Sequence, residues 1–274
     1  MFRAIILGLI LMSASTHADV AKRVISLSPH ATELAFTAGL GKYLVGVSER
    51  SDYPEQANHI ERVANYQGIK LERIIALKPD LIVVWKNGNP SKEIAKLEQL
   101  GFNIEYTETG SLEQIASNIE RLSQYSENPK QGMQAAQDFR DSLAALKQKY
   151  QVDKPVRFFY QLNSSPIMTV AKGAWPSDVF KVCGGENVFE NAAASYPQVG
   201  KEQVILAAPE VIFFSRHGMA HLNTWSDWPQ IPAVADAQLW SLNASWINRP
   251  TLRTLKAIEE VCDYFEQARL SKSQ

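Results

Sequence analysis

The chain has 274 residues, a net charge of −1, 45% hydrophobic residues and 21% charged residues. This composition is ordinary for a soluble globular protein, and the length allows two domains of about 100 to 150 residues each. A nucleic-acid-binding protein usually has a basic patch or a high isoelectric point. The near-zero charge and the lack of a basic run therefore argue against that class.

The segment from Met1 to Ala18 is typical of a secretory signal peptide. Arg3 supplies the positive start, residues 4–12 an apolar core, and residues 16–18 a small-residue cleavage site. The apolar run is shorter than the roughly 20 residues that span a bilayer. We therefore expect an exported chain whose signal is removed near Ala18, without a cysteine at that point to carry a lipid anchor; a retained anchor helix is the alternative.

Strand and helix patterns alternate through residues 19–127. The run 24–28 predicts a strand, and Pro29 begins a helix that ends at Gly39 or Gly41. Strands that alternate with helices imply a parallel sheet covered on both faces, so this half is predicted to be an α/β lobe. Further strands are expected at 45–48, 81–85 and 103–107, with helices before Pro79 and at 91–100.

The strongest helical pattern runs over residues 129–150, between the two halves. Pro129 suits the first helical position, and apolar residues from Ala135 to Leu146 recur on one face. Some 20 helical residues would span about 30 Å. We therefore expect residues 128–152 to connect the lobes as a stiff spine, unlike a flexible Gly/Ser linker.

Residues 153–274 repeat the alternating plan, which predicts a second α/β lobe. Its strands are expected at 156–160, 166–171 and 211–214, with a helix at 177–182 and a helix before Pro209. Residues 238–242 then lead to a loop at 245–250, and a terminal helix is expected at 251–268.

One stretch of the first half recurs in the second. Residues 66–85 align with residues 196–215 without a gap. In each copy a loop with a tyrosine leads to an acid in the first turn of a short helix, and a proline precedes an apolar strand. Two copies this far apart favour two similar lobes over a solenoid. The equivalent pairs are Tyr66 and Tyr196, Glu72 and Glu202, Pro79 and Pro209, and Asp80 and Glu210.

The acids and aromatics of the repeat each allow two interpretations. Glu72 and Glu202 are common residues for a helix N-terminus, or they mark a docking surface with one acid in each lobe. Tyr66, Trp85 and Tyr196 lie at loop entries or strand ends, where α/β sheets present ligand sites. Facing aromatic walls suit a large, mostly apolar ligand, although a lone tryptophan is more often a core residue.

Cys183 and Cys262 are the only cysteines of the chain. An even pair in an exported protein indicates a disulfide. It would close a loop of about 80 residues within the second lobe and contribute up to roughly 4.5 kcal/mol. Two buried thiols are the alternative.

Common catalytic motifs are missing, including the nucleophile elbow, the phosphate-binding loop and the HExxH zinc motif. With export and a two-lobed plan, this favours ligand capture over catalysis. His217 and His221 are the one metal candidate, because a spacing of four places both on one helix face. Zinc needs three or four ligands, and His30 and His59 are the only other histidines after the signal is removed. The alternative is that His217 and His221 are solvent-exposed loop residues without a metal.

Five stretches resemble the periplasmic cobalamin-binding proteins, which are substrate-binding proteins of ATP-driven importers. Two of them also occur in siderophore and haem binders of the same superfamily, so they identify the fold more than the ligand. The five are SLSPHATELAF (26–36), SDYP (51–54), LERIIALKPDL (71–81), VCGGEN (182–187) and PQVGKEQ (197–203), of which the first and third are the shared ones.

The resemblance implies a class III substrate-binding fold of the helical-backbone type, with a corrinoid held in the cleft between two α/β lobes. It implies that Glu72 and Glu202 dock on arginines of an ABC transporter in the inner membrane, and that Cys183 and Cys262 form the family disulfide. We expect a periplasmic monomer that binds cobalamin as transported ligand, with no resident cofactor or metal and no nucleic-acid partner. The ligand-binding residues would be Arg50, Tyr66, Trp85, Tyr196, Ser245, Trp246, Asn248 and Arg249.

Two positions depart from the family pattern. Arg50 stands where a ligand-contacting tyrosine is expected, and Ser245 stands where an aspartate is expected, so both bear on the preferred corrinoid. The alternatives to a corrinoid binder are a ferric siderophore or haem binder of the same superfamily and an exported enzyme with a metal site at His217 and His221.

Overall fold

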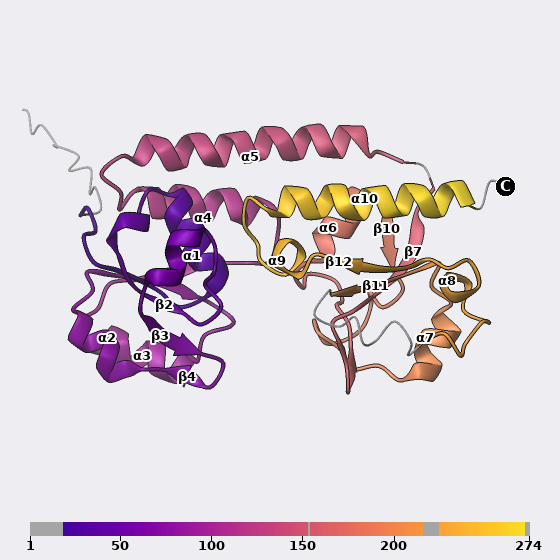
Figure 1. Ribbon diagram of the computed structural model, residues 1–274, viewed down its shortest axis with the longest axis horizontal. Helices are drawn as coiled ribbons and strands as arrows, with labels where there is room; N and C mark the ends of the chain where they lie inside the picture. Colours follow the sequence, from indigo (N-terminus) through magenta and orange to yellow (C-terminus); the bar gives the residue numbers. More distant parts are fainter. Residues whose placement is uncertain (1–18, 153, 216–224, 272–274) are drawn as a thin grey trace, which may run out of the picture.

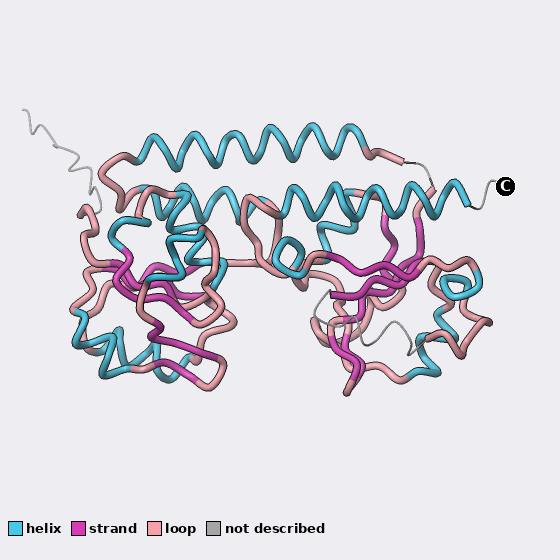
Figure 2. The backbone as a smooth tube through the Cα atoms, viewed as in Figure 1, coloured by secondary structure: helices cyan, strands magenta, loops and turns pink. Residues whose placement is uncertain are grey.

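Two α/β lobes lie side by side along one long helix, α5 (Pro129–Lys149), in the computed structural model of the chain (Figure 1). The structure describes residues 19–152, 154–215 and 225–271. Figure 2 shows that strands fill the middle of each lobe and helices its outside. The predicted fold class, two similar lobes with parallel sheets joined by a long helix, is confirmed.

The sheet of the N lobe has six strands in the order β4-β3-β2-β1-β5-β6, parallel except for the β3–β4 pair. Its central strands are apolar because both faces are covered. Leu81 and Val83 of β5 join the core on the spine side, whereas Ile82 and Val84 join a second core on the other face. The strands are β1 (Val24–Ser26), β2 (Leu44–Ser48), β3 (Arg62–Asn65), β4 (Gly68–Ile69), β5 (Leu81–Trp85) and β6 (Ile104–Thr107).

Helices cover both faces of this sheet (Figure 1). Helix α1 begins at Pro29, where the Ser28 hydroxyl accepts a hydrogen bond from the Ala31 N–H (3.3 Å). Helix α4 was not predicted, although its buried Ile115, Ile119 and Leu122 recur at helical spacing. The helices are α1 (Pro29–Thr37), α2 (Leu71–Leu77), α3 (Ser91–Gln99) and α4 (Glu113–Ser123), with short 3₁₀ turns at Gly41–Tyr43 and Glu55–His59.

The C lobe has a four-stranded parallel sheet in the order β10-β7-β11-β12. The predicted strand at 166–171 is wrong beyond its second and third residues, because only Ile167 and Met168 pair, in a two-stranded hairpin. The strands are β7 (Val156–Gln161), β8 (Asn163–Ser164), β9 (Ile167–Met168), β10 (Gly185–Asn187), β11 (Val211–Ser215) and β12 (Leu239–Leu242), and the helices are α6 (Ser177–Val182), α7 (Lys201–Ala207), α8 (Pro232–Ala235), α9 (Ala244–Ile247) and α10 (Thr254–Ser271).

A continuous apolar core joins the two lobes through α5. Helix α5 packs on α4 of the N lobe and on α10 of the C lobe. Its Phe139, Leu143 and Leu146 are buried as predicted, and Ala136 is buried more fully than Ala135. The shared core includes Leu34 of the N lobe and Phe265 of the C lobe, whereas the cores on the far faces of the two sheets are separate. The lobes are therefore joined by packing on the side of α5.

The repeat keeps its register in three dimensions. Helices α2 and α7 begin and end at equivalent positions of the two copies, and so do strands β5 and β11. Each helix ends at a non-glycine residue in the left-handed conformation, Lys78 (φ 47°) and Ala208 (φ 46°). The backbone of the helix-turn-strand unit is thus the same in both lobes.

The acid that follows the proline in each copy of the repeat, Asp80 or Glu210, accepts hydrogen bonds from the backbone at the start of a neighbouring strand. The Asp80 carboxylate accepts hydrogen bonds from the Lys22 and Arg23 N–H groups (2.8 and 3.0 Å), and the Glu210 carboxylate accepts one from the Arg157 N–H (2.9 Å). Asp80 and Glu210 therefore have a structural role that the sequence comparison alone did not identify.

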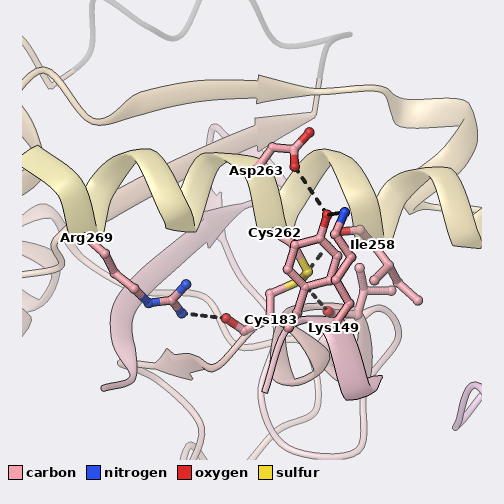
Figure 3. The surroundings of a disulfide bond; sticks show 8 residues. Lys149, Cys183, Ile258, Cys262, Asp263 and Arg269 are labelled. Carbon is pink, nitrogen blue, oxygen red and sulfur yellow. Dashed lines mark hydrogen bonds between the residues drawn. A yellow bond between two sulfur atoms is a disulfide. The ribbon is translucent and has the colours of Figure 1, made fainter. Parts of the chain in front are cut away.

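The predicted disulfide is present and lies within the C lobe (Figure 3). Cys183 follows α6 and is bonded to Cys262 of α10, 79 residues later in the chain. Arg269 of α10 also donates a hydrogen bond to the Cys183 carbonyl (2.6 Å). The bond fastens the terminal helix to the helix beside it.

Candidate functional site

A cavity of about 610 Å³ lies between the lobes, at the carboxyl ends of the strands. This is where α/β sheets place ligands, and the volume is in the range of small-molecule sites. The N lobe contributes Pro29, His30, Arg50, Trp85 and Thr109, and the C lobe contributes Leu162, Trp175, Tyr196, Ala244, Ser245, Asn248, Arg249 and Pro250.

Trp85, the last residue of β5, forms the aromatic wall of the N lobe. Its backbone N–H donates to the Asn89 side chain (2.7 Å), and its indole N–H donates to Thr109 Oγ1 (3.2 Å). A Cβ at Gly88 would overlap the indole ring, so only glycine leaves room for it there. The ring of His30 meets the indole edge to face, with centroids 5.3 Å apart. These contacts fix the indole plane.

His30 is a buried, uncharged histidine beside Trp85. Burial, together with the positive charge of Arg249, lowers the pKa of His30 to about 3. Its ring nitrogens lie 3.2 Å from Ser28 Oγ and 3.2 Å from Thr107 Oγ1. The imidazole is therefore neutral at neutral pH and presents a polar, uncharged group to the cavity.

Trp175 and Tyr196 form the aromatic wall of the C lobe. The Trp175 indole N–H donates to the Ile247 carbonyl (2.8 Å), and the Tyr196 hydroxyl donates to the Trp175 carbonyl (3.3 Å). Burial raises the pKa of Tyr196 above its usual value despite this hydrogen bond. Trp175 was not predicted from the sequence. It lies in the loop between β9 and α6, two residues before the helix, in the connection that follows sheet strand β7.

Asn248 is positioned by the ends of two strands of the C lobe. The Tyr160 hydroxyl donates to Asn248 Oδ1 (2.8 Å), and Asn248 Nδ2 donates to Ser215 Oγ (3.2 Å). Ser245 lies one turn earlier, in α9, where its N–H donates to the Asn243 side chain (3.1 Å). Both residues line the cavity, so the C lobe offers amide and hydroxyl groups next to its aromatic wall.

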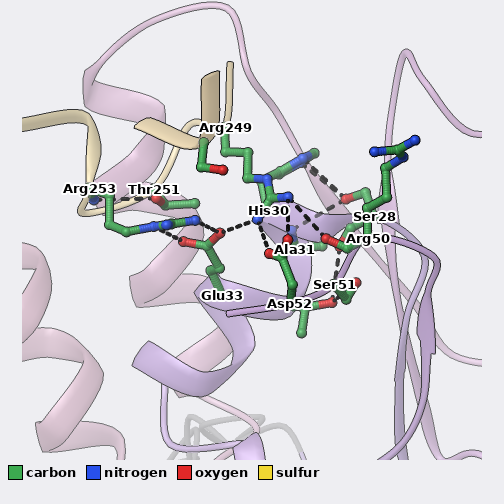
Figure 4. Close-up of polar contacts among 12 residues, drawn as sticks. Ser28, His30, Ala31, Glu33, Arg50, Ser51, Asp52, Arg249, Thr251 and Arg253 are labelled. Atoms are coloured by element: carbon green, nitrogen blue, oxygen red, sulfur yellow. Dashed lines mark hydrogen bonds and ion pairs between the residues drawn. The ribbon is translucent and has the colours of Figure 1, made fainter. Parts of the chain in front are cut away.

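Arg249 extends from the C lobe to the N lobe across one end of the cavity (Figure 4). It donates hydrogen bonds to Asp52 (2.5 Å), to Glu33 (3.3 Å) and to the Arg50 carbonyl (3.0 Å). Burial alone would raise the pKa of Asp52, but the hydrogen bond and charge of Arg249 outweigh it and hold that pKa below its usual value. Burial would lower the pKa of Arg249, but Asp52 and Glu33 raise it.

Six of the eight predicted ligand-binding residues line the cavity, and two do not. Tyr66 is 90% exposed in the turn between β3 and β4, and Trp246 packs against the core of the C lobe with Lys256 Nζ 5.5 Å from its ring centroid. A ligand contact for these two stays a prediction. The six are Arg50, Trp85, Tyr196, Ser245, Asn248 and Arg249, and the cavity residues that the sequence analysis did not name as ligand-binding are Pro29, His30, Thr109, Leu162, Trp175, Ala244 and Pro250.

Glu72 and Glu202 are exposed in the first turns of α2 and α7. Both helices lie on the side of their lobe that faces away from α5 (Figure 1). Ile75 of α2 and Leu206 of α7 are also exposed, by 39% and 84%. Each lobe thus presents an acid and an apolar side chain on one short helix.

Residues 19–152, 154–215 and 225–271 contain no group of three or more His, Cys, Asp and Glu side chains that could hold a metal ion. His217 and His221 lie outside the described residues. In the described part of the chain, no helix is long and apolar enough to cross a membrane.

A second cavity, of about 550 Å³, lies under the C-terminal end of α5. Charged groups of both signs line it, among them Glu113, Lys147, Asp178 and Lys181, and Tyr150 is its one aromatic residue among those described. It therefore lacks the facing aromatic walls of the cavity between the lobes.

The chain matches the periplasmic binding protein family over residues 24–245. It is 58% identical to a vitamin B12-binding protein of Vibrio campbellii over 96% of both chains, and 44% identical to one of Yersinia pestis over 89% of this chain and 86% of that one. The solved periplasmic vitamin B12 binding protein BtuF of Vibrio cholerae is 52% identical, with a TM-score of 0.88 over 94% of this chain and all of that one. The periplasmic haem-binding protein RhuT of Roseiflexus sp. RS-1 shares the fold, with 21% identity over 90% of this chain and 99% of that one and a TM-score of 0.81.

Proposed function

This chain belongs to the periplasmic binding protein family, and we propose that it captures cobalamin or a related corrinoid between its lobes and delivers it to an ABC importer of the inner membrane. The family consists of ligand-binding components of transport systems that act in the periplasm. The chain is accordingly a binding protein and not an enzyme.

The facing aromatic walls of the cleft carry this proposal. A corrinoid is a broad macrocycle with apolar faces and amide groups around its rim. Trp85 of one lobe and Trp175 and Tyr196 of the other suit the apolar faces, while Ser245 and Asn248 offer hydrogen-bonding groups for the amides. Relatives that are 58% and 59% identical are named vitamin B12-binding proteins, which supports a corrinoid as the ligand.

Calorimetric titration of the purified protein tests the ligand class. We expect saturable binding of cyanocobalamin at one site per chain, and no comparable heat from haem or a ferric siderophore. Heat from an iron ligand alone would contradict the proposal and favour the siderophore or haem alternative.

We further propose that Glu72 and Glu202 dock on arginines of the permease. The permease and the ATPase that drives transport together form the transporter. The two exposed carboxylates lie on equivalent helices, and the shared core along α5 holds the lobes that carry them. An exposed carboxylate–arginine pair is worth only about 0 to 1 kcal/mol. Two such pairs at a fixed separation therefore contribute orientation more than affinity.

The double variant Glu72→Ala/Glu202→Ala separates docking from ligand binding. We expect unchanged cyanocobalamin affinity and reduced stimulation of ATPase activity when the loaded protein is added to the reconstituted transporter. Glu55→Ala/Glu186→Ala, with one exposed glutamate per lobe outside α2 and α7, is the matched control. Loss of ligand affinity in the first variant would contradict the docking role.

We also propose that the mature chain begins near Asp19 and is monomeric when free, with lobes at 19–127 and 153–274 and a spine at 128–152. N-terminal sequencing and sedimentation of the exported protein measure the first two properties directly. A retained N-terminus or a stable dimer would contradict them.

A further inference from the structure

Glu33 is a buried carboxylate whose charged partners belong to the other lobe. It lies in α1 of the N lobe and its side chain is 4% exposed. Arg253 Nε donates to it (2.9 Å), Arg253 Nη2 makes a second close contact, and Arg249 Nη1 lies 3.3 Å away (Figure 4). Both arginines lie in the segment that connects α9 and α10 of the C lobe.

The pairing depends on the relative position of the lobes. A buried carboxylate is strongly unfavourable unless it is paired and hydrogen-bonded. Since the arginines that pair with Glu33 come from the C lobe, any movement that separates the lobes at this point leaves one carboxylate and two guanidinium groups without these partners. The contact therefore favours one separation of the lobes.

Two adjacent residues of the N lobe complete the contact. Asp52 accepts hydrogen bonds from Arg249, and the guanidinium of Arg253 lies over the Tyr53 ring, 4.2 Å from its centroid. We call the five residues Glu33, Asp52, Tyr53, Arg249 and Arg253 the inter-lobe clamp. It lies beside the cleft, whereas the shared apolar core joins the lobes along α5.

One member of the clamp, Arg249, lines the cavity, and Glu33 does not. We propose that Glu33 is a positioning residue of the ligand site: together with Arg253 it fixes Arg249 and holds the two walls of the cleft at one separation. With respect to the ligand, this inference rests on the proposed corrinoid-binding function. The separation of the lobes can be measured without any ligand.

The first test measures how fast cyanocobalamin leaves the protein. Glu33→Gln keeps the shape of the side chain and removes its charge. We expect the dissociation rate constant, followed by stopped-flow tryptophan fluorescence, to rise about tenfold, because truncating one partner of a buried charge pair acts mainly on dissociation. Glu105→Gln is the matched control, since Glu105 is a partly buried partner of Arg121 (3.0 Å) within one lobe, and we expect a change of less than twofold.

The second test measures the separation of the lobes in the ligand-free protein. Spin labels at Lys96→Cys and Ala235→Cys are placed on exposed positions of α3 and α8, one in each lobe. We expect the distance distribution from pulsed electron paramagnetic resonance to broaden with Glu33→Gln and to stay unchanged with Glu105→Gln. A general loss of stability would not move the distribution of the folded protein.

Arg253→Gln tests the same contact from the other lobe, and it can be measured even if Glu33→Gln does not fold. It should reproduce the faster dissociation and the broader distance distribution. The double variant Glu33→Gln/Arg253→Gln should raise the dissociation rate constant by less than the product of the two single effects. If wild-type protein binds cyanocobalamin and the clamp variants match Glu105→Gln in both measurements, the inference is wrong. If wild-type protein does not bind it, the proposed function fails, and the distance distribution alone decides whether the clamp exists.

Discussion

The two lobes share a backbone unit but differ in the side chains that they bring to the cleft. Helices α2 and α7 and the strands after them match at a constant offset, down to the left-handed residues that end both helices. The equivalent strands, however, end in Trp85 in one lobe and in Ser215 in the other. Trp85 is itself a wall of the cleft, whereas Ser215 positions Asn248. The repeat thus preserves the scaffold, while the side chains at the strand ends differ between the lobes.

The lobes also differ in how they are stabilised. The N lobe has a six-stranded sheet, whereas the C lobe has four strands in its main sheet and a disulfide between α6 and α10. A smaller sheet leaves more of the stability of the C lobe to this bond. The predictions that follow test these differences, from the largest expected effect to the smallest.

Removing the disulfide should destabilise mainly the C lobe. For Cys183→Ser/Cys262→Ser we expect the free energy of unfolding to fall by about 2 to 4 kcal/mol, because the bond closes a long loop. Hydrogen exchange should accelerate in α6 and α10 more than in α1 and α4. Reducing the wild-type protein should give the same loss and leave the variant unaffected. Equal acceleration in both lobes would contradict the comparison.

The buried histidine of the N lobe should make stability depend on pH. The unfolded chain binds a proton at His30 near the ordinary pKa of 6.5, whereas the folded chain binds it only near pH 3. The contribution of His30 to the free energy of unfolding is therefore fully present above pH 6.5. It is lost as the pH falls from 6.5 toward 3, by about 2 kcal/mol between pH 7.5 and pH 5. Urea unfolding at both pH values measures the change. His30→Gln should show a smaller loss between them, and an identical loss would exclude His30 as its source.

The two aromatic walls should contribute unequally to ligand binding. We expect Trp85→Ala to raise the Kd for cyanocobalamin about 10- to 100-fold, and Tyr196→Ala to raise it about 3- to 10-fold, because the indole is larger and Tyr196 is 45% exposed. Trp240→Phe, which alters a ring stacked on Tyr264 and not part of the cavity lining, is the control. A larger effect at Tyr196 would reverse the assigned order of the walls.

The left-handed residues after α2 and α7 should respond alike. Lys78→Gly and Ala208→Gly should each stabilise the protein by about 0.5 to 1 kcal/mol, because glycine adopts this conformation without the steric cost of a Cβ. Ala76→Gly, within α2, should instead destabilise by about 1 kcal/mol. Thermal unfolding measures all three. Opposite signs at Lys78 and Ala208 would show that the two units are not equivalent.

Periodicity and repetition predicted the lobes, the spine and the repeated unit, because these depend on local patterns of apolar residues. Helix α4 was missed although its apolar spacing is regular, and the strand at 166–171 was extended too far because an apolar run does not reveal a hairpin. Six cavity residues were identified, mostly through the resemblance to a family. The sequence assigned His30 no role beyond a possible metal ligand and Glu33 none beyond membership of a motif. Arg249 and Arg253, which act on them in the folded chain, lie near the other end of the sequence.

The position of the cobalt atom in a crystal of the protein grown with cyanocobalamin tests the central claim most directly. An anomalous difference map collected at the cobalt absorption edge should show one peak per chain, between Trp85 of the N lobe and Tyr196 of the C lobe. A peak in the second cavity under α5, or at any surface outside the cleft, would contradict the assignment of the cleft as the corrinoid site.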